Sequence, residues 1–308
     1  MTMMDDRFTF VKVDETASEH IAAPKYSYWQ SVFRKFFSSK LAILMLVIAL
    51  VIVVTSYIQP NFSNFSPLDG TNVNNAAMKF LRPNAQYWFG TDNVGKSLFD
   101  AVWYGTRTSL TVALLTTVIT NVIGIVVGMI WGYSKRFDAI MLEIYNIIYN
   151  IPFMLLVIVM LYILGPGMWQ LIFAMSCTTW LGVAYFIRVQ VMIIRDREYN
   201  LASRCLGTPM HRVLTHNILP YLISVIVTSI ARDVPSYISY EVFLSFLGVG
   251  LTVEDGSLGS MIQRYSPYMT SAPYLFWIPV AFTALISVSL YIVGQTLADA
   301  SDPRTHMM

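Results

Sequence analysis

Long uncharged, apolar runs constrain the fold of this chain more than any other feature of its sequence. Residues 41–58 are eighteen consecutive residues without a charged side chain, which is enough for a helix to cross the hydrocarbon core of a bilayer. Charged residues make up only 12% of the whole chain, whereas soluble proteins average about 25%. We therefore predict an all-α integral membrane protein. Its six expected spanning helices cover residues 41–58, 108–131, 139–164 with a bend before Pro152, 170–187, 221–247 and 274–297.

Lysine and arginine are distributed unevenly among the segments that connect these runs. If the N-terminus lies inside the cell, the inner segments hold fourteen of the 20 basic residues, as the positive-inside rule requires. Both termini are then cytoplasmic, and we predict a multi-pass protein of the plasma membrane. The expected divisions are a cytoplasmic tail with an interfacial helix at 1–40, the first spanning helix and an external loop at 41–105, and a five-helix core at 106–308. The core includes a cytoplasmic loop at about 188–219.

Two local patterns add detail to this outline. Just before the first run, apolar and aromatic residues recur on one helical face beside basic residues, which is typical of a helix lying in the membrane interface. These residues are Trp29, Val32, Phe33, Phe36 and Phe37. In the second run, Gly124, Gly128 and Gly132 repeat at four-residue spacing. Small residues at that spacing predict close approach of another helix.

A charged, helix-prone segment, residues 195–220, separates the fourth and fifth runs and predicts two short helices. The first extends from about Glu198 to Leu206 and ends at Gly207, which suits the left-handed position after a helix. Thr208 is expected to cap the second helix, with Pro209 at its first position. Apolar residues recur at helical spacing on both helices: Tyr199, Ala202 and Leu206 on the first, and Met210, Val213, Leu214 and Ile218 on the second. Arg204, His211 and Arg212 are left for water or a partner, so the segment fits either a solvated connector or a docking surface.

Charged residues inside the fifth run form a second informative group. Arg232 and Asp233 fall near its middle and Glu241 lies further on. A charge at that depth costs about 2.5–3.5 kcal/mol on insertion scales unless it faces a partner or water. The residues fit equally a hydrated path for a substrate with charged termini and a structural ion pair with another helix or subunit. We take Arg232, Asp233 and Glu241 as candidates for the translocation path.

One motif match is interpreted as coincidental. Residues 90–97 fit the phosphate-binding pattern G-x-x-x-x-G-K-[ST], but that loop requires a buried strand before it and an α/β domain around it. The predicted topology instead places it in the external loop. The chain shows no other catalytic signature, and Cys177 and Cys205 support neither a disulfide framework nor a zinc site. We therefore expect no catalytic or metal-binding residues and no cofactor bound by this chain.

Four segments together resemble the membrane subunit of a bacterial oligopeptide/dipeptide ABC importer, in the family of binding-protein-dependent permeases. Residues 88–97 resemble the L-G-T-D-x-x-G-R-D stretch of that family, which explains the coincidental motif. Residues 104–110 resemble its Y-G-A-R-x-S-L. Residues 195–220 resemble its cytoplasmic E-A-A-x-x-x-G loop, and residues 244–250 with 299–304 resemble its C-terminal third.

The resemblance implies a role for each part of the 195–220 segment. In this family the loop docks onto a separate ATPase subunit. The residues expected to couple to the ATPase are Tyr199, Ala202, Ser203, Arg204, Gly207, Met210, Arg212, Leu219 and Pro220. The segment departs from the family pattern at Leu201, which stands where the family has glutamate, so an ion pair from that position is not carried over.

The resemblance also implies a fold and a set of partners. The fold is that of a type I ABC importer permease, and the function is to form half of the translocation pathway for peptides. The implied partners are a second homologous permease, two cytoplasmic ATPase subunits that use ATP and Mg²⁺, an external binding protein and the lipid bilayer. A net charge of +2 indicates no nucleic acid. Alternatives are a permease for another small solute such as nickel, a self-sufficient secondary transporter or channel, and an intramembrane enzyme.

Overall fold

The computed structural model describes residues 28–63, 65–68 and 72–301, and within these ranges the protein is built from helices. One isolated bridge, between Thr91 and Ser97, is the strand-like pairing found there. Residues 1–27 of the predicted tail at 1–40, and Arg304, lie outside the described residues. The long helices are α2 (Lys40–Phe62), α3 (Leu98–Tyr133), α6 (Met168–Arg195), α9 (Leu219–Phe246) and α11 (Pro273–Ser301). The shorter helices are α1 (Tyr28–Ser38), α4 (Lys135–Tyr149), α5 (Phe153–Leu164), α7 (Glu198–Cys205), α8 (Met210–Arg212) and α10 (Leu258–Tyr265), with single turns at Ala76–Met78, Val213–Ile218 and Ser266–Tyr268.

The apolar runs become a bundle of membrane-length helices. Five helices in the described part of the chain are long and apolar enough to cross a bilayer, and α4 with α5 makes a sixth if the bent pair counts as one span. The two halves of that pair differ in direction by 80°. The predicted bend before Pro152 is thus present, and it is large because proline lacks an N–H and clashes with the preceding turn. The other predicted spans are confirmed, although α3 begins ten residues earlier than expected.

The glycines of α3 form its seam with α6. A Cβ at Gly128 would lie 2.5 Å from the Ala184 carbonyl oxygen, and one at Gly132 would lie 2.6 Å from the Arg188 carbonyl oxygen. A Cβ at Gly124 would meet Val183 at 2.6 Å. The predicted close approach is confirmed, because backbones this near leave no room for any side chain.

The second predicted short helix is not a separate element. Residues 210–246 form one continuous 37-residue helical stretch, in which a π-helical turn, Val213–Ile218, joins α8 to α9. The π turn lies directly before Pro220, whose missing N–H interrupts the regular ladder. The expected cap was also wrong, because the N-cap is Pro209, in extended conformation, and no side chain caps the helix.

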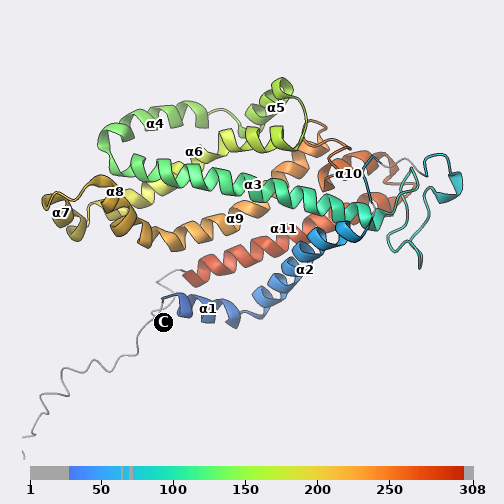
Figure 1. Ribbon diagram of the computed structural model, residues 1–308, viewed down its shortest axis with the longest axis horizontal. Helices are drawn as coiled ribbons and strands as arrows, with labels where there is room; N and C mark the ends of the chain where they lie inside the picture. Colours follow the sequence, from blue (N-terminus) through green and yellow to red (C-terminus); the bar gives the residue numbers. More distant parts are fainter. Residues whose placement is uncertain (1–27, 64, 69–71, 302–308) are drawn as a thin grey trace, which may run out of the picture.

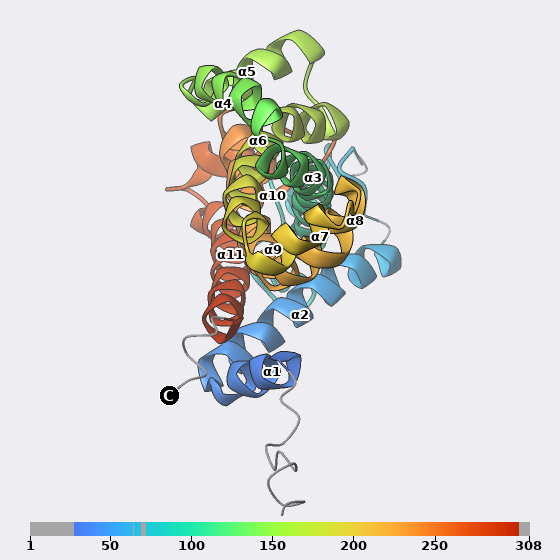
Figure 2. The ribbon, with the colours of Figure 1, turned by 90° about the vertical axis from the view of Figure 1, so that its left-hand side faces the viewer.

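The bundle has two different ends (Figure 1). Helices α7 and α8 lie at one end, and α10 lies at the other beside the segment that precedes α3. Helix α1 packs across the end of α11 (Figure 2), where Val32 and Phe36 are buried and the Tyr28 hydroxyl donates to the Ser301 carbonyl at 2.7 Å. Trp29, Phe33 and Phe37 remain exposed. Part of the predicted apolar face of α1 therefore packs inside the subunit, and the rest is exposed on its surface.

Candidate functional site

The connection between α6 and α9 is bonded to the bundle at its first residue. Arg195, the last residue of α6, is 7% exposed, and its Nη1 donates to the Gly132 carbonyl oxygen at 2.8 Å. Its guanidinium also bonds the Asp196 carboxylate, with Nη2 3.0 Å from Oδ2. These hydrogen bonds hold the pKa of the exposed Asp196 carboxyl below its usual value. The end of α6 is therefore tied to the end of α3 by a guanidinium.

Asn200 is the buried centre of the connection. It has no exposed surface, and its Nδ2 donates to the Ile194 carbonyl oxygen at 2.9 Å, at the end of α6. Asn217, in the π-helical turn, donates through Nδ2 to Asn200 Oδ1 at 3.1 Å and to Ser203 Oγ at 3.1 Å. Buried polar groups of this kind are costly to leave unpaired. One side chain thus holds α7 against both α6 and the start of the α9 stretch.

Helix α7 presents its apolar side to the outside of the subunit. Leu206 is 85% exposed, Leu201 41% and Tyr199 39%, and Ala202 is also exposed. Gly207 ends the helix with φ +76°, the left-handed conformation expected for it. Arg204 lies 3.7 Å from Asp196, Nη2 to Oδ1, beside this surface. We name the exposed side chains of Leu201, Ala202 and Leu206 the α7 face.

The second half of the connection points its apolar residues inward. Val213, Leu214 and Ile218 are buried, in a cluster with Ile187 and Val191 of α6. Of the other predicted coupling residues, Met210 and Leu219 pack partly against this cluster, Ser203 donates to the Tyr199 carbonyl oxygen at 2.9 Å, and Arg212 and Pro220 are exposed. The connection is anchored on one side and uncovered on the α7 face.

A second ion pair extends the anchoring to the broken span. Arg188 of α6 bonds both carboxylate oxygens of Asp138 in α4, with Nη2 3.0 Å from Oδ2. The guanidinium also stacks 5.5 Å from the centre of the Trp131 ring and 5.4 Å from that of Tyr185. The predominantly buried pair links α4 to α6, so a displacement of α7 that moves α6 also moves α4.

The charged residues of α9 do not share one surface. Arg232 is exposed on the subunit, whereas Asp233 is partly buried and accepts a hydrogen bond from Asn121 Nδ2 of α3 at 2.9 Å. Glu241 has no exposed surface, and its Oε1 accepts from Ser245 Oγ at 2.9 Å. Glu241 therefore lies inside the subunit, so the three candidate residues do not share one exposed surface. The Glu241 side chain is buried and that of Arg232 is exposed because α3 and α10 cover only part of the surface of α9.

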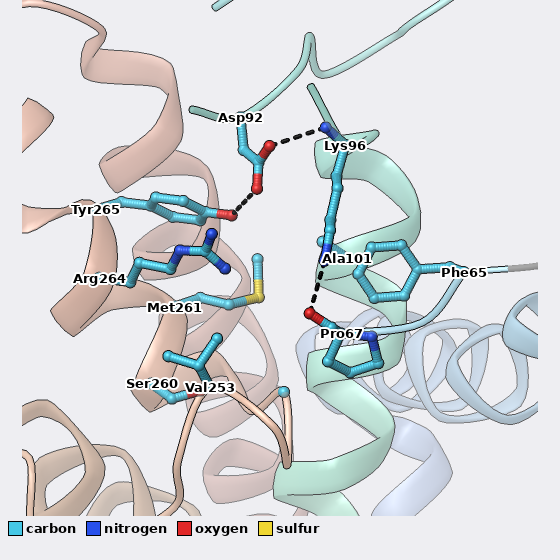
Figure 3. Close-up of a pocket in the computed structure, with 11 residues that line it drawn as sticks. Phe65, Pro67, Asp92, Lys96, Ala101, Val253, Ser260, Met261, Arg264 and Tyr265 are labelled. Atoms are coloured by element: carbon cyan, nitrogen blue, oxygen red, sulfur yellow. Dashed lines mark hydrogen bonds between the residues drawn. The ribbon is translucent and has the colours of Figure 1, made fainter. Parts of the chain in front are cut away.

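Residues 90–97, which matched the phosphate-binding pattern, form a clasp before α3. The Asp92 carboxylate accepts the backbone N–H groups of Val94 at 2.9 Å and Lys96 at 2.8 Å, and the Tyr265 hydroxyl of α10 donates to its other oxygen at 3.1 Å (Figure 3). The Lys96 ammonium donates to the Pro67 carbonyl oxygen at 2.6 Å, beside a cavity of about 30 Å³. The amides that a phosphate would need are thus used by Asp92 itself. The segment before it contains a turn and no strand among its described residues.

Sequence reasoning missed Asn200, Asn217 and Arg195. Helical spacing places Asn200 on the polar side of α7, which reads as a solvated position, and its partner Asn217 is seventeen residues away. No periodicity connects these residues. The available signal was the presence of two asparagines in a segment otherwise good at forming helices, where asparagine is a poor helix former.

The bundle of apolar helices, with the anchored loop between α6 and α9, is that of a multi-pass membrane protein. The chain belongs to the family of binding-protein-dependent transport system inner membrane components, which matches residues 124–307. The N-terminal TM domain of oligopeptide transport permease C matches residues 27–83.

Individual relatives match this chain along nearly its full length. The chain is 53% identical to the oligopeptide transport system permease protein AmiD of Streptococcus pneumoniae, over 99% of both chains. It is 33% identical to the dipeptide transport system permease protein DppC of Bacillus subtilis, over 97% of this chain and 93% of that protein. It is also 33% identical to the oligopeptide permease OppC of Bacillus subtilis, over 93% of each.

Proposed function

We propose that this chain forms half of the translocation pathway of an ATP-driven peptide importer and receives the motion of the ATPases through residues 195–220. The observation that carries the proposal is the combination of an exposed apolar α7 face with rigid anchoring behind it. Asn200 and Asn217 bond α7 to α6 and to the π-helical turn, and Arg195 bonds the end of α6 to α3, so a force on the α7 face reaches the bundle without first bending a linker. Peptide as substrate is supported by the names of the relatives.

The proposed assembly contains a second, homologous permease, two ATPase subunits and a binding protein. ATP and Mg²⁺ act in the ATPase subunits, on the side of the membrane that holds both termini and the α7 face. The binding protein meets the opposite end, where α10 and the clasp lie. The excess of basic residues at the α7 end supports this orientation.

In the proposed cycle, closure of the ATPases displaces α7 as a rigid body. Helix α6 follows through Asn200, α3 follows α6 through Arg195, and α4 follows α6 through the Arg188–Asp138 pair. Rigid-body movement of packed helices is a common way to alternate between two openings. The lack of a glutamate at Leu201 means that contact with the ATPase relies here on apolar area and shape, since Leu201 itself is 41% exposed.

The test is a matched pair of substitutions of exposed leucines at the two ends. Leu206→Asp puts a charge on the α7 face, and we expect it to release the ATPase subunits from the purified complex and to abolish ATP-dependent peptide uptake. Leu68→Asp, where the side chain is 66% exposed at the opposite end, should leave ATPase association intact. Retention of the ATPases and normal uptake by the Leu206→Asp variant would refute the proposal. Uptake without ATP by the purified chain alone would show a secondary transporter instead.

A further inference from the structure

A cavity of about 470 Å³ opens where α4 and α5 separate. Its walls come from the break itself, from the middle of α6 and from α9. Tyr149 and Pro152 lie at the break, Gly182 belongs to α6 and Tyr240 to α9. The volume is within the range of ligand-binding pockets, about 300–1,000 Å³. It exists because the 80° bend carries α5 away from the line of α4 and leaves α6 uncovered beside it.

The depth of the cavity excludes a lipid-exposed position for the break. The α6 residues that line it, 178–182, are halfway along the 28-residue helix Met168–Arg195, so they lie inside the apolar thickness. Irregular backbone is tolerated at that depth only where it is buried in protein or lines a hydrated cavity. The N-terminus of α5 has no side-chain cap at Pro152. Its free amides therefore require a polar or hydrated compartment, which the cavity provides.

The walls are apolar, with both aliphatic and aromatic side chains, and carry a few hydroxyl groups. The Tyr240 ring lies 4.9 Å from the Phe153 ring, tilted by 50°, and together they form one apolar side. Thr179 Oγ1 donates to the Met175 carbonyl oxygen at 2.8 Å, so this hydroxyl can offer the cavity an acceptor. A Cβ built on Gly182 meets nothing within 4 Å. An apolar or aromatic group fits the space, and N–H donors attached to it fit the threonine hydroxyl.

We propose that this cavity is a subsite that takes an apolar or aromatic side chain of the peptide in transit. The inference rests on the proposed function and deepens it, because it places part of the substrate selection in this chain rather than in the binding protein alone. The free N–H groups of a peptide backbone are the donors that Thr179 accepts, and the side chain occupies the space over Gly182. A lipid acyl chain and a side chain of the second permease are the competing occupants.

The experiment uses the complete transporter with its binding protein, reconstituted in liposomes. Uptake is measured for two peptides of equal length and charge, an all-alanine peptide and the same peptide with a central phenylalanine. Gly182→Leu adds an apolar side chain to the cavity at a position where a Cβ meets nothing within 4 Å. We expect uptake of the phenylalanine peptide to fall roughly tenfold, the lower end of the range over which a hydrophobic pocket discriminates one methylene group, while uptake of the alanine peptide changes less than about twofold. Phe173→Trp, at a 54% exposed position of the same helix, should change neither.

Other results overturn the inference. An equal loss of uptake for both peptides would mean that the cavity serves helix movement or contact with the second permease. Unchanged uptake of both peptides would mean that the cavity is unoccupied or filled by lipid. If Gly182→Leu fails to assemble, a peptide with a photoreactive benzophenone in place of the phenylalanine decides the matter in the unmodified transporter. Crosslinks on α6 or α9 support the subsite, and crosslinks confined to lipid or the binding protein refute it. Absence of ATP-dependent uptake of either peptide by the unmodified transporter would instead refute the proposed function.

Discussion

Single buried side chains fix the geometry at both ends of the bundle by hydrogen bonding. Asn200 does so at the α7 end, with all of its surface buried. At the other end the Tyr265 hydroxyl, 2% exposed as a residue, donates to Asp92, and the Tyr274 hydroxyl donates to the Thr91 carbonyl oxygen at 3.0 Å. The Tyr265 and Tyr274 bonds join residues 173 and 183 positions apart in the chain, and the bond from Asn217 to Asn200 joins residues 17 apart. Stability at each end is therefore sensitive to one residue.

The clasp gives a prediction about alkaline pH. Burial, and then the nearby Asp92 carboxylate, raise the pKa of Tyr265 well above its ordinary value of 10.0. The folded protein keeps this proton where the unfolded chain loses it, so the contribution is complete below pH 10 and is lost as the pH rises above it. We expect the midpoint temperature of thermal unfolding to fall more steeply between pH 9.5 and 11 in the unmodified protein than in the Tyr265→Phe variant. At pH 7 we expect the variant to be the less stable of the two. Parallel midpoint curves would contradict this prediction.

Among the elements, α3 and α6 make the tightest pair, and their contact depends on missing side chains. A Cβ at Gly128 would press on the backbone of Ala184, which cannot move aside as a side-chain tip can. Gly182 on α6 is the opposite case, because its missing Cβ faces open space. Glycine is therefore required by close backbone packing at position 128, whereas position 182 has room for a side chain.

This difference predicts opposite effects of the same substitution. Gly128→Ala should destabilise the protein by about 1–3 kcal/mol, the usual cost of overpacking. Gly182→Ala should be neutral or stabilise by up to about 1 kcal/mol, because alanine is the better helix former. Thermal unfolding of the two variants in the same detergent measures both. A Gly128→Ala midpoint equal to that of Gly182→Ala would mean that the seam is looser than the structure shows.

At the scale of the whole molecule, the subunit leaves polar surface where a membrane would otherwise surround it. Arg232 is exposed at the middle of α9, and a charge at that depth needs a partner or water. The subunit supplies neither a carboxylate within ion-pair distance nor a covering helix there among its described residues. We therefore expect this side chain to face either the proposed path or the proposed second permease.

We expect Arg232→Ala to lower peptide uptake several-fold in the assembled transporter, with Arg232→Lys retaining part of the activity because it keeps the charge. Val118→Ala, at a 58% exposed position of α3, is the control for a change of surface at similar depth. The stoichiometry of the purified complex separates the two causes. Loss of the second permease indicates an interface, whereas an intact complex with reduced uptake indicates the path. Unchanged uptake with an intact complex would show that Arg232 serves neither role.

The sequence by itself determined the properties that depend on local composition. Insertion in a bilayer follows the apolar runs, so the spans were predictable, as were the bend before Pro152, the glycine seam of α3 and the helix end at Gly207. The exposed apolar side of α7 was visible as a periodicity, but its direction was not. Only the tertiary structure decided which side of each helix is covered. It placed Glu241 inside and Arg232 outside, joined Asn200 to Asn217, merged residues 210–246 into one helix and opened the cavity over Gly182. Apart from the merged helix, whose π turn has a local cause at Pro220, these outcomes depend on contacts between different elements of the fold, and such contacts leave no periodic signal in the sequence.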